Sequence, residues 1–343
     1  MNKFLALAFG GTMLAGTWTC AVTTQSLAQT GAAKGTGKPL VKVTQSMPAR
    51  DINFLPWYLA DKKGFFAEEG LEVALPNMTT QVAIPALVSK QIEFGIGSSS
   101  ARAAYQGAPL KVLMYMFTGW PLIAVATKDI KSYKDLSGKI IATSSVGGSD
   151  NLITRLLIER EKVTDYQLIP IGVPAARHTA MSAGQVHFTM IDPLTAYKLE
   201  KEGFNIIGSA DDIHRVPSGG YAVHEDLLSQ RQDVALAWLR ATIKALLYIK
   251  SETAAAADFA VTELGLDREL SLKSLQYSAR YIDEKDPGGS SEAALVQATA
   301  DDFSQLKIAG DPKAMAIKVH DFTLLRQAQR QLGIKCTSGY QCP

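Results

Sequence analysis

Along the first two-thirds of the chain, short apolar runs alternate with segments whose apolar positions have helical spacing. The runs are rich in Val, Ile and Leu and are typical of strands; they cover residues 40–46, 71–76, 92–97, 111–117, 122–127, 139–145, 167–172, 186–192 and 204–208. Helical spacing is found over residues 80–90, 149–162, 177–184 and 193–203. This alternation predicts the α/β class with mostly parallel sheets. From residue 227 onward the pattern is almost wholly helical, with residues 235–250 the clearest amphipathic stretch.

Two segments of this pattern resemble each other. Residues 86–96 align with residues 180–190 at a constant offset, and the identical positions are Ala86/Ala180, Gln91/Gln185 and Phe94/Phe188. A weaker echo aligns residues 41–46 with residues 140–145. We interpret the match as a duplication that gives two similar α/β lobes. Ser98 and Asp192 then follow equivalent strands.

The first 28 residues have the pattern of a secretory signal peptide. Lys3 precedes an apolar run over residues 4–16, and Ser26 and Ala28 are small residues at the expected cleavage site before Gln29. The run is shorter than the roughly 20 residues that a membrane span needs. A lipid anchor at Cys20 is the alternative, but residues 17–19 poorly match the small residues that precede a lipidated Cys. Residues 29–39, rich in Gly and Ala, are expected to form a flexible lead-in.

Cleavage after Ala28 would remove Cys20 and leave two cysteines, Cys336 and Cys342. In an oxidising compartment such neighbours favour a disulfide, which would pin the tail over residues 336–343. The chain-entropy model assigns about 2 kcal/mol to so short a loop. Two free thiols are the alternative.

Composition and motifs exclude several function classes. The chain has 343 residues with 35 Lys and Arg against 33 Asp and Glu, so a net charge of +2 provides no field for nucleic acid or an anionic membrane. Three Cys and five scattered His offer little for a metal cluster. The sequence lacks G-x-S-x-G, H-E-x-x-H, P-loop and C-x-x-C motifs. We therefore expect no catalytic residues, no metal and no cofactor.

Two Gly- and Ser-rich segments follow strands and begin helices. In open parallel sheets, ligands bind beyond the carboxyl ends of the strands. Glycine lets the backbone approach a ligand, and the free N–H groups of a helix start favour an anion. The candidate ligand-binding residues in the two segments are Ser98, Ser99, Ser100, Ser145, Gly147, Gly148 and Ser149. Helix capping is the alternative role for Ser100 and Ser149.

Further candidates lie after the first strand and at the expected crossings between lobes. A polar loop that leads into aromatic residues suits an organic ligand, and its candidates are Met47, Arg50, Asn53 and Phe54. Trp120 and Tyr221 lie where the chain would cross between the lobes. Asp192, before Pro193, either caps the next helix or accepts an amine or hydroxyl of the ligand. Phe54 has a core position as its alternative, and Arg50 a pairing with Asp51.

With these residues in view, the chain resembles the periplasmic solute-binding proteins of ABC importers, within the nitrate/sulfonate/taurine and thiamine-precursor-binding group. The resemblance covers about residues 40–335. It is carried by the A-x-x-x-G-x-F-x-x-x-G-L-x-V stretch within residues 59–73, and by residues 86–100, 135–140 and 180–193. It implies a type II periplasmic-binding-protein fold, in which two α/β lobes joined by two crossings close on a ligand. Lobe 1 would comprise residues 40–120 and 220–335, and lobe 2 residues 121–219.

The resemblance also implies a function. We expect a monomeric periplasmic receptor that captures a small anionic or zwitterionic organic solute and delivers it to the membrane permease of an ABC importer. Asp192 departs from the aromatic or small residue expected before that Pro, which favours a zwitterion or polar heterocycle over plain sulfonate or nitrate. An enzyme of pyrimidine or thiamine-precursor metabolism is the alternative, although the cysteine-rich motif of the related synthases is absent. A sensor domain is a weaker alternative.

Overall fold

The computed structural model describes residues 39–48, 50–213 and 215–343. The expected signal peptide and almost all of the lead-in lie outside these residues. The described residues belong to one compact unit. Among them, no helix has both the length and the apolar character that a membrane crossing requires.

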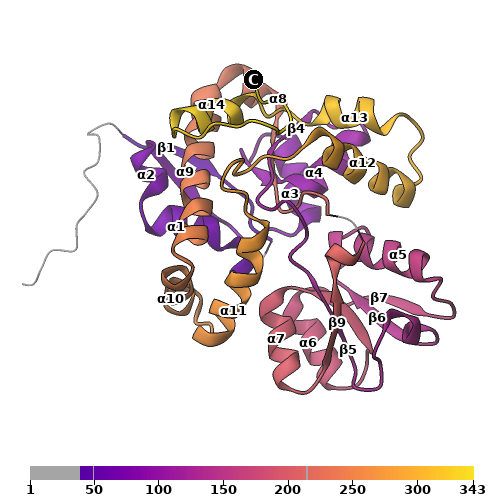
Figure 1. The fold of residues 1–343 in the computed structure, drawn as a ribbon. Coiled ribbons are helices and arrows are strands. Elements are labelled where there is room, and N and C mark those ends of the chain that lie inside the picture. Colours follow the sequence, from indigo (N-terminus) through magenta and orange to yellow (C-terminus); the bar gives the residue numbers. More distant parts are fainter. Residues whose placement is uncertain (1–38, 49, 214) are drawn as a thin grey trace, which may run out of the picture. The chain divides into compact units, whose positions relative to one another are not determined.

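The strands of lobe 1 come from two separate parts of the chain, residues 41–114 and residues 221–224; β1 and β4 are labelled in Figure 1. Strand β1 (Val41–Thr44) pairs in parallel with β2 (Leu71–Ala74). In a second sheet, β10 (Tyr221–His224) lies between β3 (Gly95–Ile96) and β4 (Leu110–Met114) and is antiparallel to both. This strand was not predicted. It follows the second crossing, so the sheet is complete only after the chain has returned from lobe 2.

Lobe 2 is built on a five-stranded sheet in the order β7-β6-β8-β5-β9. The strands are β5 (Ile123–Ala126), β6 (Ile140–Thr143), β7 (Gln167–Pro170), β8 (Phe188–Ile191) and β9 (Asn205–Ser209). Strand β6 is parallel to β7 and β8, whereas β5 is antiparallel to β8 and β9. The α/β class is therefore confirmed, but the expectation of mostly parallel sheets is wrong: among the described residues three strand pairs are parallel and four are antiparallel. Consecutive α/β units pair in parallel, and β5 and β10, the first strand after each crossing, run antiparallel to their neighbours.

Helices surround these sheets and form the C-terminal part of the chain. In chain order they are α1 (Leu55–Lys62), α2 (Phe65–Glu68), α3 (Thr80–Val88), α4 (Gly97–Tyr105), α5 (Ser149–Glu161), α6 (Pro174–Ser182), α7 (Pro193–Lys201), α8 (Glu225–Gln230), α9 (Gln232–Ser251), α10 (Thr253–Leu264), α11 (Arg268–Ser278), α12 (Glu292–Leu306), α13 (Pro312–Val319) and α14 (Thr323–Gln331). The predicted helical pattern after residue 227 is confirmed, and α1 begins inside the aromatic segment that follows the first strand.

The two faces of the lobe 2 sheet bury different side chains. Ala124 and Ala126 pack with α5 on one face, whereas Ile123 and Val125 pack with α6 and α7 on the other. This follows from the alternation of side chains along a strand. Leu194 of α7 and Tyr277 of α11 pack against both this second face and the core of lobe 1. The two lobes therefore share an apolar contact.

The duplicated segments have the same backbone geometry. After each of the helices α3 and α6, the backbone N–H of a Gln donates a hydrogen bond to a carbonyl within the helix. Gln91 donates to the Ala86 carbonyl at 2.8 Å, and Gln185 donates to the Ala180 carbonyl at 2.9 Å. The residue before each Gln is left-handed, with φ 62° at Lys90 and 69° at Gly184. This is a glycine-type helix end at both positions.

The strand that follows each of these helices pairs in the same way. Phe94 pairs in parallel with Gln45, and Phe188 with Ile141. Gln45 and Ile141 are therefore equivalent positions of the two repeats. The echo between residues 41–46 and 140–145 aligned Gln45 with Ser144 and is out of register.

Candidate functional site

The helix starts of the two lobes meet along one side. Arg102 of α4 donates a hydrogen bond to the Gly147 carbonyl, in the loop before α5. Next to this contact, Ser98 and Trp120 line a cavity of about 20 Å³ together with Leu152 of α5. This volume holds about one water molecule. Two predicted residues, Ser98 of lobe 1 and Trp120 of the first crossing, therefore lie together next to α5 of lobe 2.

The lobes meet again through α7 and α11. Lys201 pairs with Glu269 at 3.0 Å, and Lys273 pairs with Glu200 at 2.8 Å. These ion pairs are about half exposed or more, and pairs of this kind contribute only about 0–1 kcal/mol each. They can break without a large cost, so they are suited to a contact that opens and closes.

Asp192 lies at the end of β8 and begins α7. Its Oδ1 accepts a hydrogen bond from the Thr195 backbone N–H at 3.0 Å, so it caps the helix. The residue is 4% exposed, and its Oδ2 has no hydrogen-bond partner among the described residues. Burial raises the pKa of this carboxyl, against the hydrogen bond from Thr195 and the charge of Arg177. One oxygen is used by the cap, and the second is left for another partner.

Asp51 lies in the loop after β1, in lobe 1, and the charge of Asp192 acts on its carboxyl group. Its Oδ1 accepts the Asn53 N–H at 2.8 Å and caps the short helix over Ile52–Phe54. Burial, and then the charge of Asp192, raise the pKa of Asp51 to about 7, while the hydrogen bonds to Asn53 lower it. The charge of one carboxyl group therefore acts on the other, although they belong to different lobes.

Sequence reasoning treated Asp51 only as a possible partner of Arg50. The structure places Arg50 elsewhere: it is exposed, its Nη2 donates to the Glu263 carbonyl at 2.5 Å, and its guanidinium lies 5.9 Å from the Tyr58 ring centre. The sequence signal that could have identified Asp51 is its position as a helix cap after a strand, which matches the position of Asp192.

A buried ion pair supports the lobe 2 side of the site. Arg177 of α6 donates to the Asp150 carboxylate at 2.9 Å and to the Met190 carbonyl at 2.7 Å. Asp150 also accepts hydrogen bonds from the backbone N–H and hydroxyl of Ser144. Asp150 therefore points back into the loop before α5, and it does not cap the helix, whose N-cap is Gly148. No sequence motif indicated the role of Arg177.

The loop before α5 holds the remaining lobe 2 candidates. Gly148 is the N-cap of α5, and Ser149 is its first residue. A Cβ added at Gly148 would lie 2.6 Å from the Ser144 hydroxyl oxygen and 2.9 Å from that of Ser145. Gly147 has φ 74°, a conformation that glycine adopts readily. The segment thus presents a glycine among serine hydroxyls at a helix start.

The other lobe 1 candidates vary in exposure. Ser99 is half-buried, and Ser100 is buried with a hydroxyl that has no partner among the described residues. Asn53 lines a cavity of about 10 Å³ with Phe117. Phe54 is half-buried, with its ring centre 6.2 Å from that of Trp57.

Met47 and Tyr221 lie in the core of lobe 1. Met47 is fully buried, and its sulfur accepts a hydrogen bond from the Tyr221 hydroxyl at 3.3 Å. The same hydroxyl donates to the Ser46 carbonyl at 2.7 Å, and the Tyr221 ring centre lies 4.4 Å from that of Trp57. Both residues therefore belong to the core of lobe 1.

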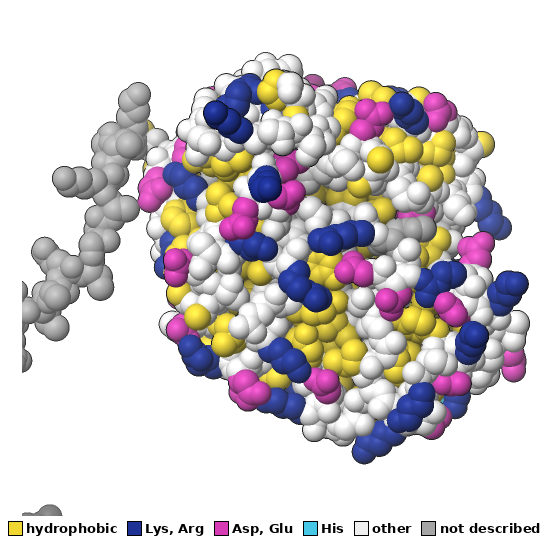
Figure 2. Space-filling model, viewed as in Figure 1, with side chains coloured by type: hydrophobic (Ala, Val, Ile, Leu, Met, Phe, Trp, Pro, Cys, Tyr) yellow, Lys and Arg dark blue, Asp and Glu magenta, His cyan; other side chains and the backbone are white. Residues whose placement is uncertain are grey.

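A larger cavity, of about 630 Å³, lies beside the crossings. It is lined by Thr118 and Arg215, by side chains between residues 280 and 294, and by the tail at Ser338 and Gly339. Cations and carboxylates both line it, and the face in Figure 2 likewise mixes Lys and Arg with Asp and Glu. It contains none of the predicted site residues.

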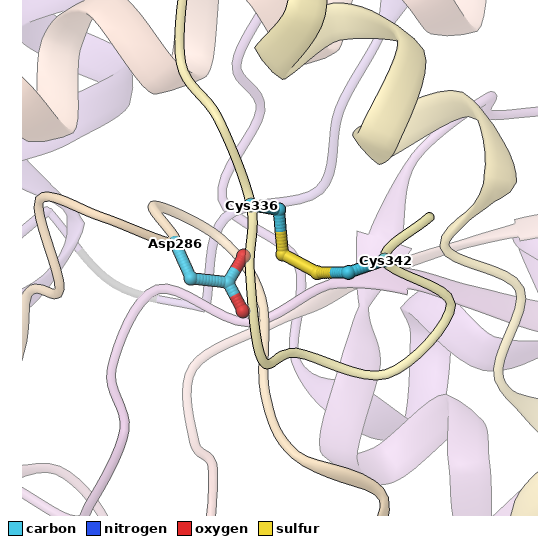
Figure 3. Close-up of side chains that lie close together, drawn as sticks. All are labelled: Asp286, Cys336 and Cys342. Carbon is cyan, nitrogen blue, oxygen red and sulfur yellow. A yellow bond between two sulfur atoms is a disulfide. The ribbon is translucent and has the colours of Figure 1, made fainter.

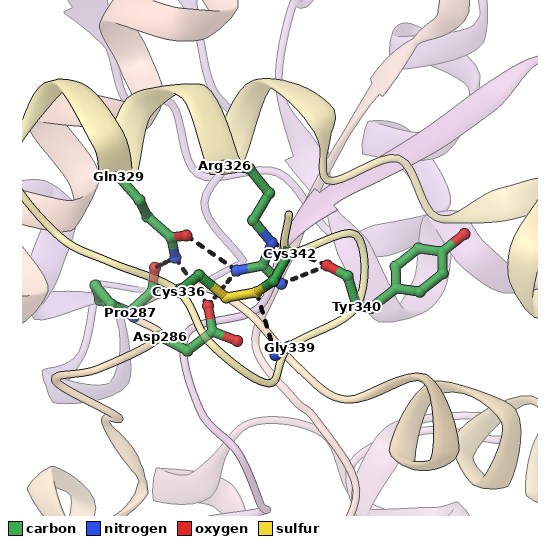
Figure 4. The surroundings of a disulfide bond; sticks show 8 residues. All are labelled: Asp286, Pro287, Arg326, Gln329, Cys336, Gly339, Tyr340 and Cys342. Carbon is green, nitrogen blue, oxygen red and sulfur yellow. Dashed lines mark hydrogen bonds and ion pairs between the residues drawn. A yellow bond between two sulfur atoms is a disulfide. The ribbon is translucent and has the colours of Figure 1, made fainter.

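The disulfide between Cys336 and Cys342 is present, with 5.6 Å between the Cα atoms. Asp286 lies beside it (Figure 3), but the sulfurs are bonded to each other and the thiolates that a metal would need are absent. Arg326 of α14 donates to the Tyr340 carbonyl at 2.6 Å and pairs with Asp286 (Figure 4). The tail is therefore fixed by side chains as well as by the disulfide.

The family model described as NMT1/THI5 like matches residues 51–256. The riboflavin-binding protein RibY of Chloroflexus aurantiacus is 27% identical over 238 residues, which cover 65% of this chain and 67% of that protein.

Two crystal structures have a similar fold at low identity. The periplasmic nitrate-binding protein NrtA from Synechocystis PCC 6803 has a TM-score of 0.72 at 14% identity, over 85% of this chain and 89% of its own. The periplasmic sulfonate-binding protein SsuA from Methylobacillus flagellatus has a TM-score of 0.67 at 17% identity, over 87% of this chain and 96% of its own. The chain therefore has the two-lobed periplasmic-binding-protein fold.

Proposed function

Because this chain belongs to the NMT1/THI5-like family, we propose that it is a secreted solute-binding protein that captures a small organic solute between its lobes and delivers it to the permease of an ABC importer. The observation that carries this proposal is the contact between helix starts of the two lobes, where Ser98 of α4 and Leu152 of α5 line one cavity next to the hydrogen bond from Arg102 to the carbonyl before α5. The names of the riboflavin-, nitrate- and sulfonate-binding relatives support the same class of function.

Capture requires the lobes to open. The cavity that Ser98 and Trp120 line together with α5 measures about 20 Å³, which is far too small for an organic solute. The two crossings pair with each other, since Phe117 and Ser218 exchange backbone hydrogen bonds at 3.2 and 2.9 Å. Bending at this paired segment, with loss of the exposed ion pairs between α7 and α11, would admit the solute. Closure would then trap it and present the closed form to the permease.

The solute contacts proposed here are those of the sequence analysis together with Asp51. In support, Ser98 and Trp120 line a cavity with α5, and Gly148 follows the residue whose carbonyl accepts a hydrogen bond from Arg102. Met47 and Tyr221 would act from the core of lobe 1, by holding the loop that carries Asp51.

Compartment and oligomeric state are part of the same proposal. Cleavage of residues 1–28 would release a monomer into the periplasm. The disulfide at the C-terminus is consistent with an oxidising compartment.

We propose that the protein releases its solute unchanged, in line with relatives whose names describe binding proteins. The test is native mass spectrometry of protein purified from the periplasm, followed by denaturation and identification of any released compound. A co-purified metabolite that stays intact on prolonged incubation with the protein supports the proposal. Conversion of that metabolite into a product would contradict it.

A further inference from the structure

The chemistry of the solute can be inferred from the carboxylate of Asp192. A buried carboxylate oxygen without a hydrogen bond is costly, and native proteins rarely keep one without a purpose. Asp192 Oδ2 is such an atom among the described residues, whereas Oδ1 is held by the Thr195 N–H. Since Leu194, two residues further on, packs against the core of lobe 1, the start of α7 is turned toward the other lobe. The free oxygen belongs to this interlobe surface.

Asp51 is a second carboxylate at this surface, and it increases the negative charge that a ligand would have to balance. Asp51 has one oxygen on the Asn53 N–H and lies close enough for the charge of Asp192 to raise its pKa to about 7, after the effect of burial. Two such carboxylates cannot both be ionised at low cost unless a cation lies between them.

The cationic side chains near Asp51 and Asp192 are already bound to other groups. Arg177, whose charge acts on Asp192, is bound to Asp150. Arg50 donates to the Glu263 carbonyl and lies over Tyr58, the other titratable side chain near Asp51. Among the described residues, no Lys or Arg forms an ion pair with Asp51 or Asp192.

We propose that the solute carries a protonated nitrogen, an amine or an amidinium-type group, whose N–H groups donate to Asp192 Oδ2 and to Asp51. This inference rests on the proposed function and selects a zwitterion or a cationic heterocycle over a plain anion. A hydroxyl would satisfy the hydrogen bond but leave two like charges facing each other. An anion would add a third.

The test uses pairs of probes that differ in one nitrogen. Taurine and isethionate, and β-alanine and propionate, are titrated into the mature protein by calorimetry. We expect at least one nitrogen-bearing member to bind about tenfold or more tightly than its partner. Binding of a nitrogen-free member with equal or greater affinity would overturn the inference and leave solute capture standing. Binding of no probe would count against both proposals.

The residues are tested with the best-binding nitrogen-bearing probe. Asp192→Asn keeps the size of the side chain and its cap, and should weaken binding about tenfold or more. Asp311→Asn, a change at the exposed cap of α13, is the matched control and should leave affinity unchanged. Asp51→Asn should remove a rise in affinity between pH 6 and pH 8, because the cation displaces a proton from Asp51. Tighter binding by Asp192→Asn, or a co-purified solute without a protonatable nitrogen, would overturn the inference.

Discussion

Arg177 and Asp150 form a buried ion pair in lobe 2, with 2.9 Å between Nη1 and Oδ2 and side chains that are 5% and 8% exposed. The pair joins α6 to the start of α5, and a further hydrogen bond from Arg177 reaches the Met190 carbonyl in β8. The position of the loop over residues 144–149 therefore depends on one guanidinium group.

Arg177→Met should destabilise the protein by about 3–5 kcal/mol, because it leaves Asp150 buried without a counter-charge. Urea unfolding at neutral pH measures this change. Lys139→Met is the matched control, since it removes the half-buried partner of the exposed Asp129 and should cost less than about 1 kcal/mol. Equal effects of the two substitutions would contradict the structural role given to Arg177.

Gly148→Val should abolish solute binding while the fold is kept. The backbone at Gly148, with φ −66° and ψ 160°, is allowed for Val, so the obstacle is space: the added Cβ would lie 2.6 Å from the Ser144 hydroxyl. The loop must shift, and affinity should fall by about tenfold or more in calorimetry. Val146→Ala, at an exposed position of the same loop, should bind as the unchanged protein does. Normal affinity in the Gly148 variant would remove this loop from the site.

Replacing Cys336 and Cys342 by Ser should lower the free energy of unfolding by about 2 kcal/mol. Denaturant titration measures it, and a reductant should have the same effect on the unchanged protein but none on the double variant. The fold should persist, because Arg326 and the backbone hydrogen bond from Tyr340 to the Ser290 carbonyl at 2.7 Å still hold the tail. An unchanged unfolding midpoint would show that the disulfide does not constrain the unfolded chain.

Acidification should protonate His320 only at a cost to stability. His320 Nδ1–H donates to the Ala316 carbonyl at 2.7 Å, and Nε2 accepts the Tyr115 hydroxyl at 2.9 Å, so both ring nitrogens are satisfied in the neutral form. Burial lowers its pKa from 6.5 to about 4. The unfolded chain therefore binds more protons between these values, and this group's contribution to stability is full above pH 6.5 and is lost as pH falls to about 4.

The size of this loss is about 3 kcal/mol, from the difference in pKa. Urea unfolding from pH 7 to pH 4 should show it as the difference between the unchanged protein and His320→Gln. Asp51, whose raised pKa acts in the opposite direction, is common to both proteins and cancels. Parallel stability profiles for the two proteins would contradict the assignment.

Local patterns were enough for much of the fold. Apolar runs located β5–β9, and the repeat of Gln91 and Gln185 marked two equivalent helix ends. The centre of the lobe 1 sheet was missed, because β10 has four residues and its partners lie more than a hundred positions earlier in the chain. Pairing over such distances leaves no periodic signal.

The site was predictable only in part, for a similar reason. Asp192 could be singled out because a helix cap before Pro has a local signature. The role of Asp51 depends on the burial and charge that Asp192 and the rest of the fold create around it. Arg177 looks like any basic residue of a helix until α5, α6 and β8 are assembled.

The position of β10 has a consequence for the order of assembly. A chain that emerges N-terminus first exposes β3 and β4 well before their shared neighbour, which follows the whole of lobe 2. The strands of the lobe 2 sheet all lie between Ile123 and Ser209. They can therefore pair before β10 has been synthesised, while the lobe 1 sheet is still incomplete. During synthesis, lobe 2 should thus fold first, and lobe 1 should fold last although its first strands are made earlier.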